Sequence, residues 1–425
     1  MSGLNFLNKL LGGVDVEWLS LGELGDFIRG NGLQKKDFVE SGFPAIHYGQ
    51  IYTRYGLSAD KTFTYVLPEL ANKLRKARKN DLLLATTSEN DEDVVKPLAW
   101  LGDNVAISGD MMLFRHEQNV KYLAYFFQSE IFQTQKMKYI TGAKVRRVSS
   151  GDLSKIKIPI PCSNNPEKSL AIQSEIVRIL DKFTALTAEL TAELTAELTM
   201  RKKQYNYYRD KLLSFDEGEV EWKTLGAIGK FTYGYAAKAQ ISGDARFVRI
   251  TDINTNGKLS PFEPMFVDIS AENEKYTLKN NDLLMARTGA TFGKTMIFEE
   301  DYPAIYAGFL IKLSLDRDII DPKYYWHFAQ SDYFWEQANK LVSGGGQPQF
   351  NANALKQIKV PIPYPNEAGK SLSEQARIVS VLDKFDILAS SITEGLPREI
   401  ELRQKQYEYY RDLLFSFPKP EIASH

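Results

Sequence analysis

Few residues in this sequence have the types and spacing that catalysis or metal binding requires. There is one cysteine, Cys162, and the four histidines (His47, His116, His327 and His425) lie far apart. This excludes a disulfide framework and a zinc site built from several thiolates. A nucleophile elbow of the form Gly-x-Ser-x-Gly is also absent. We therefore expect neither a metal site nor a nucleophilic active site.

Two motifs come close to known catalytic signatures but depart from them. The segment GATFGKT, from Gly289, has one spacer residue fewer than a phosphate-binding loop needs, and a strand-like segment follows it. The segment DPKYY, from Asp321, is close to the Asp-Pro-Pro-Tyr of adenine methyltransferases, but Lys323 replaces the second proline. We expect a helix N-terminus there, with Asp321 as N-cap and Pro322 at the first position. No catalytic residue and no cofactor site is predicted in this chain.

The remaining polar residues suit contacts with nucleic acid. Residues 134–157 contain seven lysines and arginines against one carboxylate, as phosphate contacts require. The matching stretch 336–359 is rich in Gln and Asn, which can recognise adenine, whereas Arg can recognise guanine. The candidate DNA-binding residues are His47, Tyr48, Gln50, Tyr52, Arg54, Lys144, Arg146, Arg147, Tyr233, Tyr235, Lys238, Arg287, Thr288, Thr291, Lys294, Gln347, Gln349 and Asn351. Each of these taken singly is more often a solvated surface residue.

The overall composition is that of a globular protein without a general affinity for anions. Hydrophobic residues make up 43% of the 425 residues, which excludes a wholly disordered chain. Lys and Arg number 53 against 54 Asp and Glu, so only local patches can favour nucleic acid. No uncharged apolar run approaches the ~18 residues of a membrane helix, and the N-terminus has no signal-peptide pattern. We expect a cytoplasmic protein.

An internal repeat organises the elements that must position these residues. The segment RKKQYNYYRDKLLSF, from Arg201, recurs as RQKQYEYYRDLLFSF, from Arg403, with eleven of fifteen positions identical. The segments KSLAIQSEIVRILDKF and IKIPIP recur with the same offset of 202 residues, and VEW and NDLL segments recur close to it. Between these matches lie two divergent stretches, about 23–155 and 227–357. Residues 1–13 are similar to the end of a repeat helix, which predicts that the termini lie close together.

The repeated frame is predicted to be largely helical. Residues 169–214 have apolar side chains at helical spacing and contain no Pro or Gly. We expect this helix to pair with its duplicate, residues 371–416, in which Gly395 and Pro397 predict a break. Three TAEL units occupy residues 187–198. Their four-residue period does not fit a heptad, so we interpret them as a length element, although a slippage repeat without function is the alternative.

The divergent stretches are predicted to be mixed α/β. Short apolar runs such as DLLLAT, NVAIS, RFVRIT and AIYAGFLIKLSL predict strands. The aromatic-rich segments YLAYFFQSEIFQTQKM and YYWHFAQSDYFWEQANKLV predict amphipathic helices, and we expect their aromatic side chains to be core rather than base-stacking surfaces. Each stretch ends in a polar, Gly-containing loop before a Pro-Ile-Pro turn that leads into the long helix.

These motifs together identify a family resemblance over the whole chain. The repeated IKIPIP/IKVPIP, ILDKF/VLDKF and RKKQYNYYRD/RQKQYEYYRD segments, with the TAEL units, resemble the specificity subunits of type I restriction-modification systems, IC family. The resemblance implies that each divergent stretch is a target-recognition domain for one half of a split, asymmetric DNA site. It implies that the helices act as a spacer and dock two modification subunits.

The resemblance also implies where the reaction takes place. The modification subunits would hold S-adenosylmethionine and methylate adenine, and restriction subunits, which translocate DNA with ATP and Mg²⁺, would complete the complex. This chain would then be no enzyme by itself. The competing interpretations are a self-contained DNA methyltransferase, which would bind S-adenosylmethionine, and a coiled-coil scaffold without a DNA role.

The predicted fold class is mixed α/β, with two target-recognition domains separated by two long antiparallel coiled-coil helices in a pseudo-two-fold repeat. The predicted domains are an N-terminal helical stub, the first recognition domain, a central helical region with the TAEL units, the second recognition domain and a C-terminal helical region: 1–14, 15–155, 156–216, 217–357 and 358–425.

Overall fold

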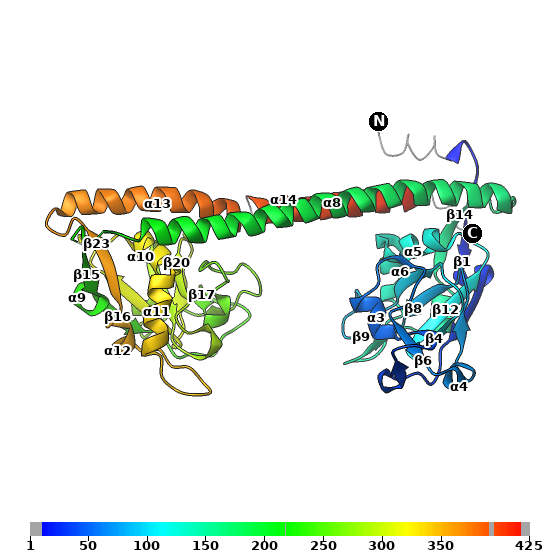
Figure 1. The fold of residues 1–425 in the computed structure, drawn as a ribbon, viewed down its shortest axis with the longest axis horizontal. Coiled ribbons are helices and arrows are strands. Elements are labelled where there is room, and N and C mark those ends of the chain that lie inside the picture. The colour runs from blue at the N-terminus through cyan, green and yellow to red at the C-terminus, as the bar shows by residue number, and fades with distance from the viewer. Residues whose placement is uncertain (1–10, 217, 391–394, 418–425) are drawn as a thin grey trace. The chain divides into compact units, whose positions relative to one another are not determined.

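The structure, a computed structural model, describes residues 11–216, 218–390 and 395–417. The chain forms two compact units. Unit 1 consists of the residues up to 191 together with those from 402 onward, and unit 2 consists of residues 192–401. Each unit combines small β-sheets with stretches of long helix (Figure 1). The predicted mixed α/β class with an internal repeat is confirmed.

Both units contain the same two-stranded antiparallel sheet, made from the repeated frame. In unit 1, β1 (Val16–Ser20) pairs with β14 (Lys157–Pro161), and in unit 2, β15 (Val220–Thr224) pairs with β23 (Lys359–Pro363). The register is the same, because the tryptophan of each VEW segment lies opposite the first proline of each Pro-Ile-Pro segment. The expectation of a Pro-Ile-Pro turn is therefore wrong. An edge strand tolerates proline, since the missing N–H can lie on the side without a partner.

A larger sheet with the same order of its first four strands forms the centre of each unit. In unit 1 the order is β2 (Gly25–Arg29), β12 (Met111–His116), β8 (Leu82–Ala85), β10 (Lys96–Trp100) and β5 (Ser58–Ala59). In unit 2 it is β16 (Gly229–Tyr233), β22 (Leu310–Leu315), β19 (Asp282–Ala286) and β20 (Thr295–Phe298). The central strands β8 and β19 are almost entirely buried, as expected of their continuous apolar runs.

Smaller sheets and short helices complete the units. Unit 1 has a second sheet of β3 (Phe38–Val39), β6 (Thr64–Val66), β4 (Phe43–Ile46), β11 (Val105–Ile107) and β7 (Lys76–Ala77), and the pair β9 (Thr87–Ser88) and β13 (Arg146–Arg147). Its short helices are α2 (Leu21–Leu24), η1 (Lys35–Asp37), α3 (Tyr48–Thr53), α4 (Pro68–Ala71) and α7 (Ser150–Leu153). Unit 2 has β18 (Phe266–Val267), β17 (Ala245–Val248) and β21 (Ala304–Tyr306), with α9 (Leu225–Ile228), η2 (Ile250–Asp252), η3 (Glu274–Tyr276), η4 (Gly289–Thr291) and α12 (Ala352–Leu355).

Each aromatic-rich segment forms two helices rather than the single one expected. Unit 1 has α5 (Val120–Gln128) and α6 (Glu130–Met137), and unit 2 has α10 (Pro322–Phe328) and α11 (Asp332–Leu341). The serine between the two helices is the N-cap of the second, because its side chain accepts a hydrogen bond from a backbone N–H three residues on. The predicted N-cap Asp321 is confirmed, since its side chain accepts from the backbone N–H groups of Lys323 and Tyr324.

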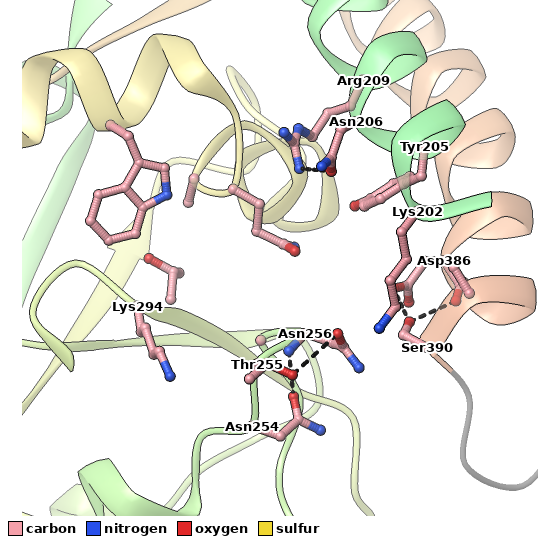
Figure 2. A pocket seen from close by; sticks show the side chains of 16 residues that line it. Lys202, Tyr205, Asn206, Arg209, Asn254, Thr255, Asn256, Lys294, Asp386 and Ser390 are labelled. Carbon is pink, nitrogen blue, oxygen red and sulfur yellow. Dashed lines mark hydrogen bonds between the residues drawn. The ribbon is translucent and has the colours of Figure 1, made fainter. Parts of the chain in front are cut away.

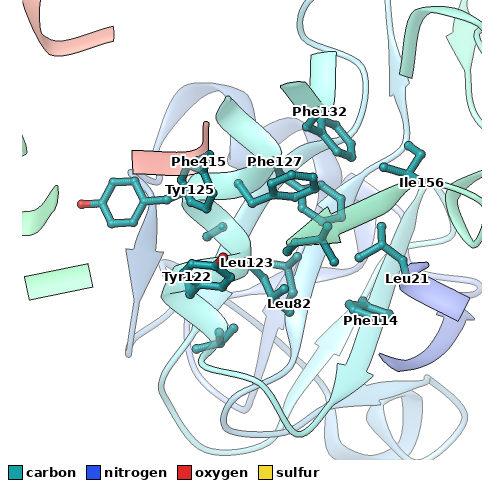
Figure 3. Packing of buried hydrophobic residues seen from close by; sticks show 14 of the residues in the cluster. Leu21, Leu82, Phe114, Tyr122, Leu123, Tyr125, Phe127, Phe132, Ile156 and Phe415 are labelled. Carbon is teal, nitrogen blue, oxygen red and sulfur yellow. The ribbon is translucent and has the colours of Figure 1, made fainter. Parts of the chain in front are cut away.

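Aromatic side chains of α5 form the core of unit 1, as predicted (Figure 3). Phe415, near the C-terminal end of the chain, completes this core, with its ring centroid 5.2 Å from that of Tyr122 and 5.7 Å from that of Phe126. Leu11 and Phe417 belong to the same cluster, so the two ends of the described chain pack into one core. Most of residues 1–13, for which we predict the end of a repeat helix, lie outside the described residues.

The frame helices pair in the same way within each unit. Helix α8 (Pro166–Leu212) is 47 residues long, without a break at the TAEL units. In unit 1, Phe183 of α8 stacks on Tyr410 of α14 (Leu396–Phe415) at 5.2 Å between centroids. In unit 2, Tyr208 of α8 stacks on Phe385 of α13 (Ala368–Ser390) at 5.3 Å. The two stacked pairs are repeat-equivalent, because an offset of 202 residues relates Phe183 to Phe385 and Tyr208 to Tyr410. The predicted break separates α13 from α14.

Candidate nucleic-acid interface

The polar loops that end the two divergent stretches occupy equivalent places in the two units. In unit 1, Arg147 of β13 pairs with Thr87 of β9, just after the central strand β8. In unit 2, Gln349 forms the equivalent antiparallel bridge to Thr288, just after the central strand β19. Each terminal loop therefore lies against the loop that leaves the middle of the sheet. The terminal loop presents an arginine at this place in one unit and a glutamine in the other.

In unit 2 this arrangement holds Arg287 firmly. Its Nε donates to the carbonyl oxygen of Gly308 at 3.2 Å. Its guanidinium carbon lies 5.1 Å from the ring centroid of Tyr233 and 5.5 Å from that of Phe309. Within the described ranges neither terminal nitrogen of Arg287 has a hydrogen-bond acceptor. These two nitrogens form the fork that can donate to two acceptors on one guanine edge.

Several other unit 2 candidates surround Arg287, but their polar side chains form hydrogen bonds with the backbone of the loop. The hydroxyl of Tyr233 accepts from the backbone N–H of Ala352 at 3.1 Å. The side chain of Asn351 caps α12 by accepting from two backbone N–H groups. Thr291 donates to the carbonyl oxygen of Thr288 at 3.3 Å. Gln347 is exposed, and Gln349 is partly buried beside them. The structure thus brings together most of the predicted unit 2 set.

Three unit 2 candidates lie elsewhere. The ring of Tyr235 packs against Tyr276, at 5.6 Å between centroids. Lys238 is exposed, and no contact in the described part of the chain joins it to Arg287. Lys294 lines a cavity beside α8. Phe309, by contrast, was not predicted from the sequence, although the residue is 57% exposed and lies next to Arg287. The glycine before it, which interrupts an apolar run, was the available signal.

The unit 1 candidates in and around α3 mostly stabilise the fold. His47 is buried, and its Nδ1 accepts from the backbone N–H of Gly49. Burial lowers the pKa of His47, so it is held neutral there. Gln50 accepts from the His47 backbone N–H at 2.8 Å, and the ring of Tyr48 packs on that of His47. Arg54 lies over the ring of Phe63. Their contact with DNA remains a prediction.

Tyr52 is the α3 residue that belongs to the loop cluster. Its hydroxyl lies 3.1 Å from the carbonyl oxygen of Ala85 and 2.9 Å from that of Thr87. Burial raises its pKa, which keeps the hydroxyl protonated and able to donate. Because Thr87 pairs with Arg147, Tyr52 supports the strand opposite the basic loop.

Only some of the lysines and arginines in residues 134–157 are available to a ligand. Lys136 is fully buried, and its Nζ donates to the carbonyl oxygens of Glu92 and Val94. Burial lowers the pKa of Lys136 to about 8. The expectation that the whole run faces phosphate is therefore wrong for this residue, because its position on α6 directs it into the core. Arg146 pairs with Asp91 at 2.8 Å. Arg147 and Lys144 are exposed.

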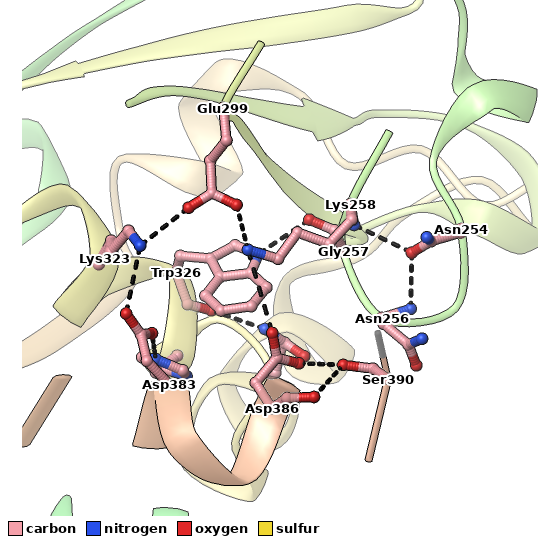
Figure 4. A network of polar contacts seen from close by, with 12 residues as sticks. Asn254, Asn256, Gly257, Lys258, Glu299, Lys323, Trp326, Asp383, Asp386 and Ser390 are labelled. Atoms are coloured by element: carbon pink, nitrogen blue, oxygen red, sulfur yellow. Dashed lines mark hydrogen bonds and ion pairs between the residues drawn. The ribbon is translucent and has the colours of Figure 1, made fainter. Parts of the chain in front are cut away.

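A polar network joins α10 of unit 2 to its long helices (Figure 4). Lys323 lies 2.9 Å from Glu299 and 3.2 Å from Asp383, which also bonds His327 Nε2 at 2.8 Å. The other ring nitrogen of His327 lies 2.9 Å from the hydroxyl of Tyr205. Burial lowers the pKa of His327 despite the nearby Asp383. Both ring nitrogens are thus used internally, so the network is structural rather than a general base for catalysis.

Unit 1 contains the matching network with different residues. Lys121 pairs with Asp181 at 2.5 Å, and the hydroxyl of Tyr125 donates to Asp181 at 2.8 Å. Tyr125 therefore stands where unit 2 has His327. The position on the frame is the same, and only the side chain that reaches the aspartate differs.

Comparison with known proteins agrees with the doubled frame. The family described as type I restriction modification DNA specificity domain matches residues 13–200 and again residues 218–402. The chain belongs to this specificity family. It is 40% identical, over the full length of both chains, to the type I restriction enzyme EcoR124I/EcoR124II specificity subunit of Escherichia coli. It is also 33% identical to the EcoprrI specificity subunit of the same species, over 93% of each chain.

Solved structures show the fold of this specificity family. A chain from a structure of complex assembly and conformational transition in a type I restriction-modification system matches with a TM-score of 0.64 at 15% identity, covering 94% of this chain and 97% of that one. The HsdS subunit of Thermoanaerobacter tengcongensis matches with a TM-score of 0.51 at 14% identity, covering 94% and 96%.

The described residues contain neither a membrane-spanning helix nor a cluster of metal ligands. No helix there combines the length and the apolar composition needed to cross a membrane. No group of three or more His, Cys, Asp and Glu side chains there could hold a metal ion.

Proposed function

We propose that this chain selects the DNA sequence for a type I restriction-modification complex, without catalysing a reaction itself. Each unit would recognise one half of a split, asymmetric site. The observation that supports this most is the pair of equivalent loop clusters, in which backbone pairing at the same place presents Arg147 in one unit and Arg287 with Gln349 in the other. One scaffold with two unlike sets of polar side chains suits recognition of two unlike half-sites.

The proposal assigns the chemistry to other polypeptides. Two modification subunits would dock on the long helices, bind S-adenosylmethionine and methylate adenine, and restriction subunits would supply translocation with ATP and Mg²⁺. The DNA-contacting residues would come from residues 15–155 and 217–357, with 156–216 and 358–425 as the helical frame and 1–14 as its N-terminal stub. Such a complex would act on DNA in the cytoplasm. The full-length identity to specificity subunits supports this assignment.

An exchange of one divergent stretch tests the proposal. Replacing residues 227–357 by the equivalent stretch of another family member should change one half-site and leave the other unchanged, because each unit has its own central sheet and core. Methylome sequencing of a host that expresses the chimaera with modification subunits measures this. The control replaces residues 23–155 and should change the opposite half-site. Alteration of both half-sites by either exchange would contradict the proposal.

A further inference from the structure

A cavity of about 270 Å³ lies in unit 2, and no residue of the terminal loop, 343–353, lines it. Figure 2 shows the side chains that do. Its walls come from the C-terminal part of α8, the end of α13, the α10–α11 segment, the loop that follows Ile253 and the start of β20. The cavity lies next to the polar network of Figure 4, since both include Asp386 and Ser390.

Three cationic side chains line this cavity. Lys202 and Arg209 come from α8, and Lys294 comes from the turn before β20. The side chain of Arg209 is only 6% exposed, and it is held by Asn206 at 3.1 Å and Asp210 at 3.2 Å. Neither lysine forms an ion pair with any residue in the described ranges. Because Asp210 balances the charge of Arg209, the two lysines without an acidic partner supply the excess positive charge, which favours an anionic ligand.

The loop opposite the cations also presents hydrogen-bond donors. The Oδ1 of Asn254 accepts from the backbone N–H groups of Asn256 and Lys258, each at 2.9 Å. This leaves the amide NH₂ of Asn254 as its remaining polar group (Figure 2). The one carboxyl group on the lining is Asp386, which receives a hydrogen bond from Ser390, lies 4.0 Å from Lys258, and has its pKa raised by burial.

Comparison of the two copies of the frame points to the same conclusion. The segments from Arg201 and Arg403 differ at only four of fifteen positions, and two of these differences lie on the cavity. Lys202 corresponds to Gln404, and Asn206 corresponds to Glu408. Gln404 donates to Glu408 at 2.9 Å on α14. Both differences make the unit 2 helix more positive, at the place where its other side chains already favour an anion.

We propose that this cavity binds a phosphate group. The phosphate can belong to the DNA backbone, in which case the site rests on the proposed function, or to a small free phosphate compound. In both cases the two lysines neutralise the oxygens, and Arg209 and the amide of Asn254 donate hydrogen bonds to them. The site lies on the frame helix and not on the terminal loops, so it would supply affinity rather than recognition of bases.

The test exchanges the two frame residues for those of the other copy. In the full chain, K202Q/N206E should weaken binding of inorganic phosphate about tenfold or more, since one cation is lost and one carboxylate is added. The variant should fold, because the same Gln–Glu pair is already bonded on α14. The control K203Q removes an exposed lysine of the same helix that does not line the cavity, and it should bind phosphate as the wild type does. Binding is followed by thermal shift at constant ionic strength.

A second measurement distinguishes the sources of the phosphate. With partner subunits and cognate duplex, a fall in the salt slope of DNA binding by about one in K202Q/N206E assigns the site to a backbone phosphate, whether or not free phosphate binds. Weaker binding of inorganic phosphate with an unchanged slope assigns it to a free phosphate compound. If neither quantity changes relative to K203Q, the cavity is no phosphate site. Should the wild-type complex fail to bind DNA, the proposed function fails, while the phosphate measurement still decides this inference.

Discussion

Arg287 shows how the loops of unit 2 can hold a side chain rigid enough to distinguish bases. A free arginine loses considerable rotamer entropy when it binds, but Arg287 is already fixed by Gly308 and by the rings of Tyr233 and Phe309. Because Arg287 is already fixed in the folded protein, much of its rotamer entropy is lost on folding, so less is lost when DNA binds. At the repeat-equivalent position unit 1 has Thr86, which is buried and bonded to the carbonyl oxygen of Asp110.

Replacement of Arg287 should therefore relax recognition at a single base pair. We expect Arg287→Ala to reduce discrimination at one position of the unit 2 half-site by about 1–3 kcal/mol, and Arg287→Lys to restore the charge without the discrimination. Competition binding with duplexes substituted position by position measures this. Lys238→Ala, which removes an exposed cation outside the loop cluster, is the control. Loss of discrimination in the other half-site would count against the assignment.

Two neighbouring arginines in unit 1 should differ in their contribution to DNA binding. Arg146 is already neutralised by Asp91 at 2.8 Å, whereas Arg147 is exposed. We expect Arg147→Ala to lower the salt slope of DNA binding by about one and Arg146→Ala to leave it nearly unchanged. Binding constants of the assembled complex between low and high salt provide the slopes. A slope for Arg147→Ala equal to that of the wild type would remove Arg147 from the contact surface.

At the scale of elements, both copies of the frame hydrogen-bond an aspartate of the long helix, but with different side chains. Asp181 in unit 1 accepts from Tyr125, and Asp383 in unit 2 bonds His327. Only the second arrangement contains a group whose ordinary pKa lies near neutral pH, because tyrosine stays protonated there. Burial lowers the pKa of His327 below its ordinary value of 6.5. The unfolded chain therefore takes up this proton first as the pH falls.

The sign of the effect gives a test. Above pH 6.5, His327 does not change the free energy of unfolding. As the pH falls from 6.5 toward the lower folded-state pKa of His327, the free energy of unfolding decreases. His327→Tyr, which copies Tyr125, should lose less stability between pH 7 and pH 5 than the wild type. Asp386, whose raised pKa acts in the opposite direction, is present in both proteins, as is His116, whose pKa burial lowers to about 4. Urea unfolding at several pH values measures the difference. Parallel pH profiles would contradict this role of His327.

The elements were largely predictable where local signals were strong. The apolar runs gave the central strands, and Asp321 with Pro322 gave the start of α10. The split of each aromatic helix was missed, because the pattern of apolar residues continues across it and only a serine N-cap separates the two helices. The Pro-Ile-Pro strand was missed as well, since proline indicates a turn unless the partner strand is known.

At the scale of the whole molecule, the length of the frame helix is the quantity that the TAEL units change. Helix α8 continues through residues 187–198 without interruption. We expect deletion of one unit, residues 191–194, to shorten the helix by about 6 Å and the gap between recognised half-sites by one or two base pairs, at roughly 3.4 Å each. Methylome sequencing would reveal the new gap. Glu193→Gln, which keeps the length, should leave it unchanged. An unchanged gap after deletion would show that the units do not set it.

The sequence by itself determined the repeat, the long helices and the family, because these depend on periodicity and on identity at a constant offset. Only the tertiary structure decided which charges are available. Lys136 and Arg147 look alike in the sequence, yet one lies in the core and the other at the surface. The same holds for Lys202, Arg209 and Lys294, which surround one cavity although 92 residues separate the first from the last. Whether a charged side chain is buried or ion-paired depends on packing between distant segments, which no local sequence pattern encodes.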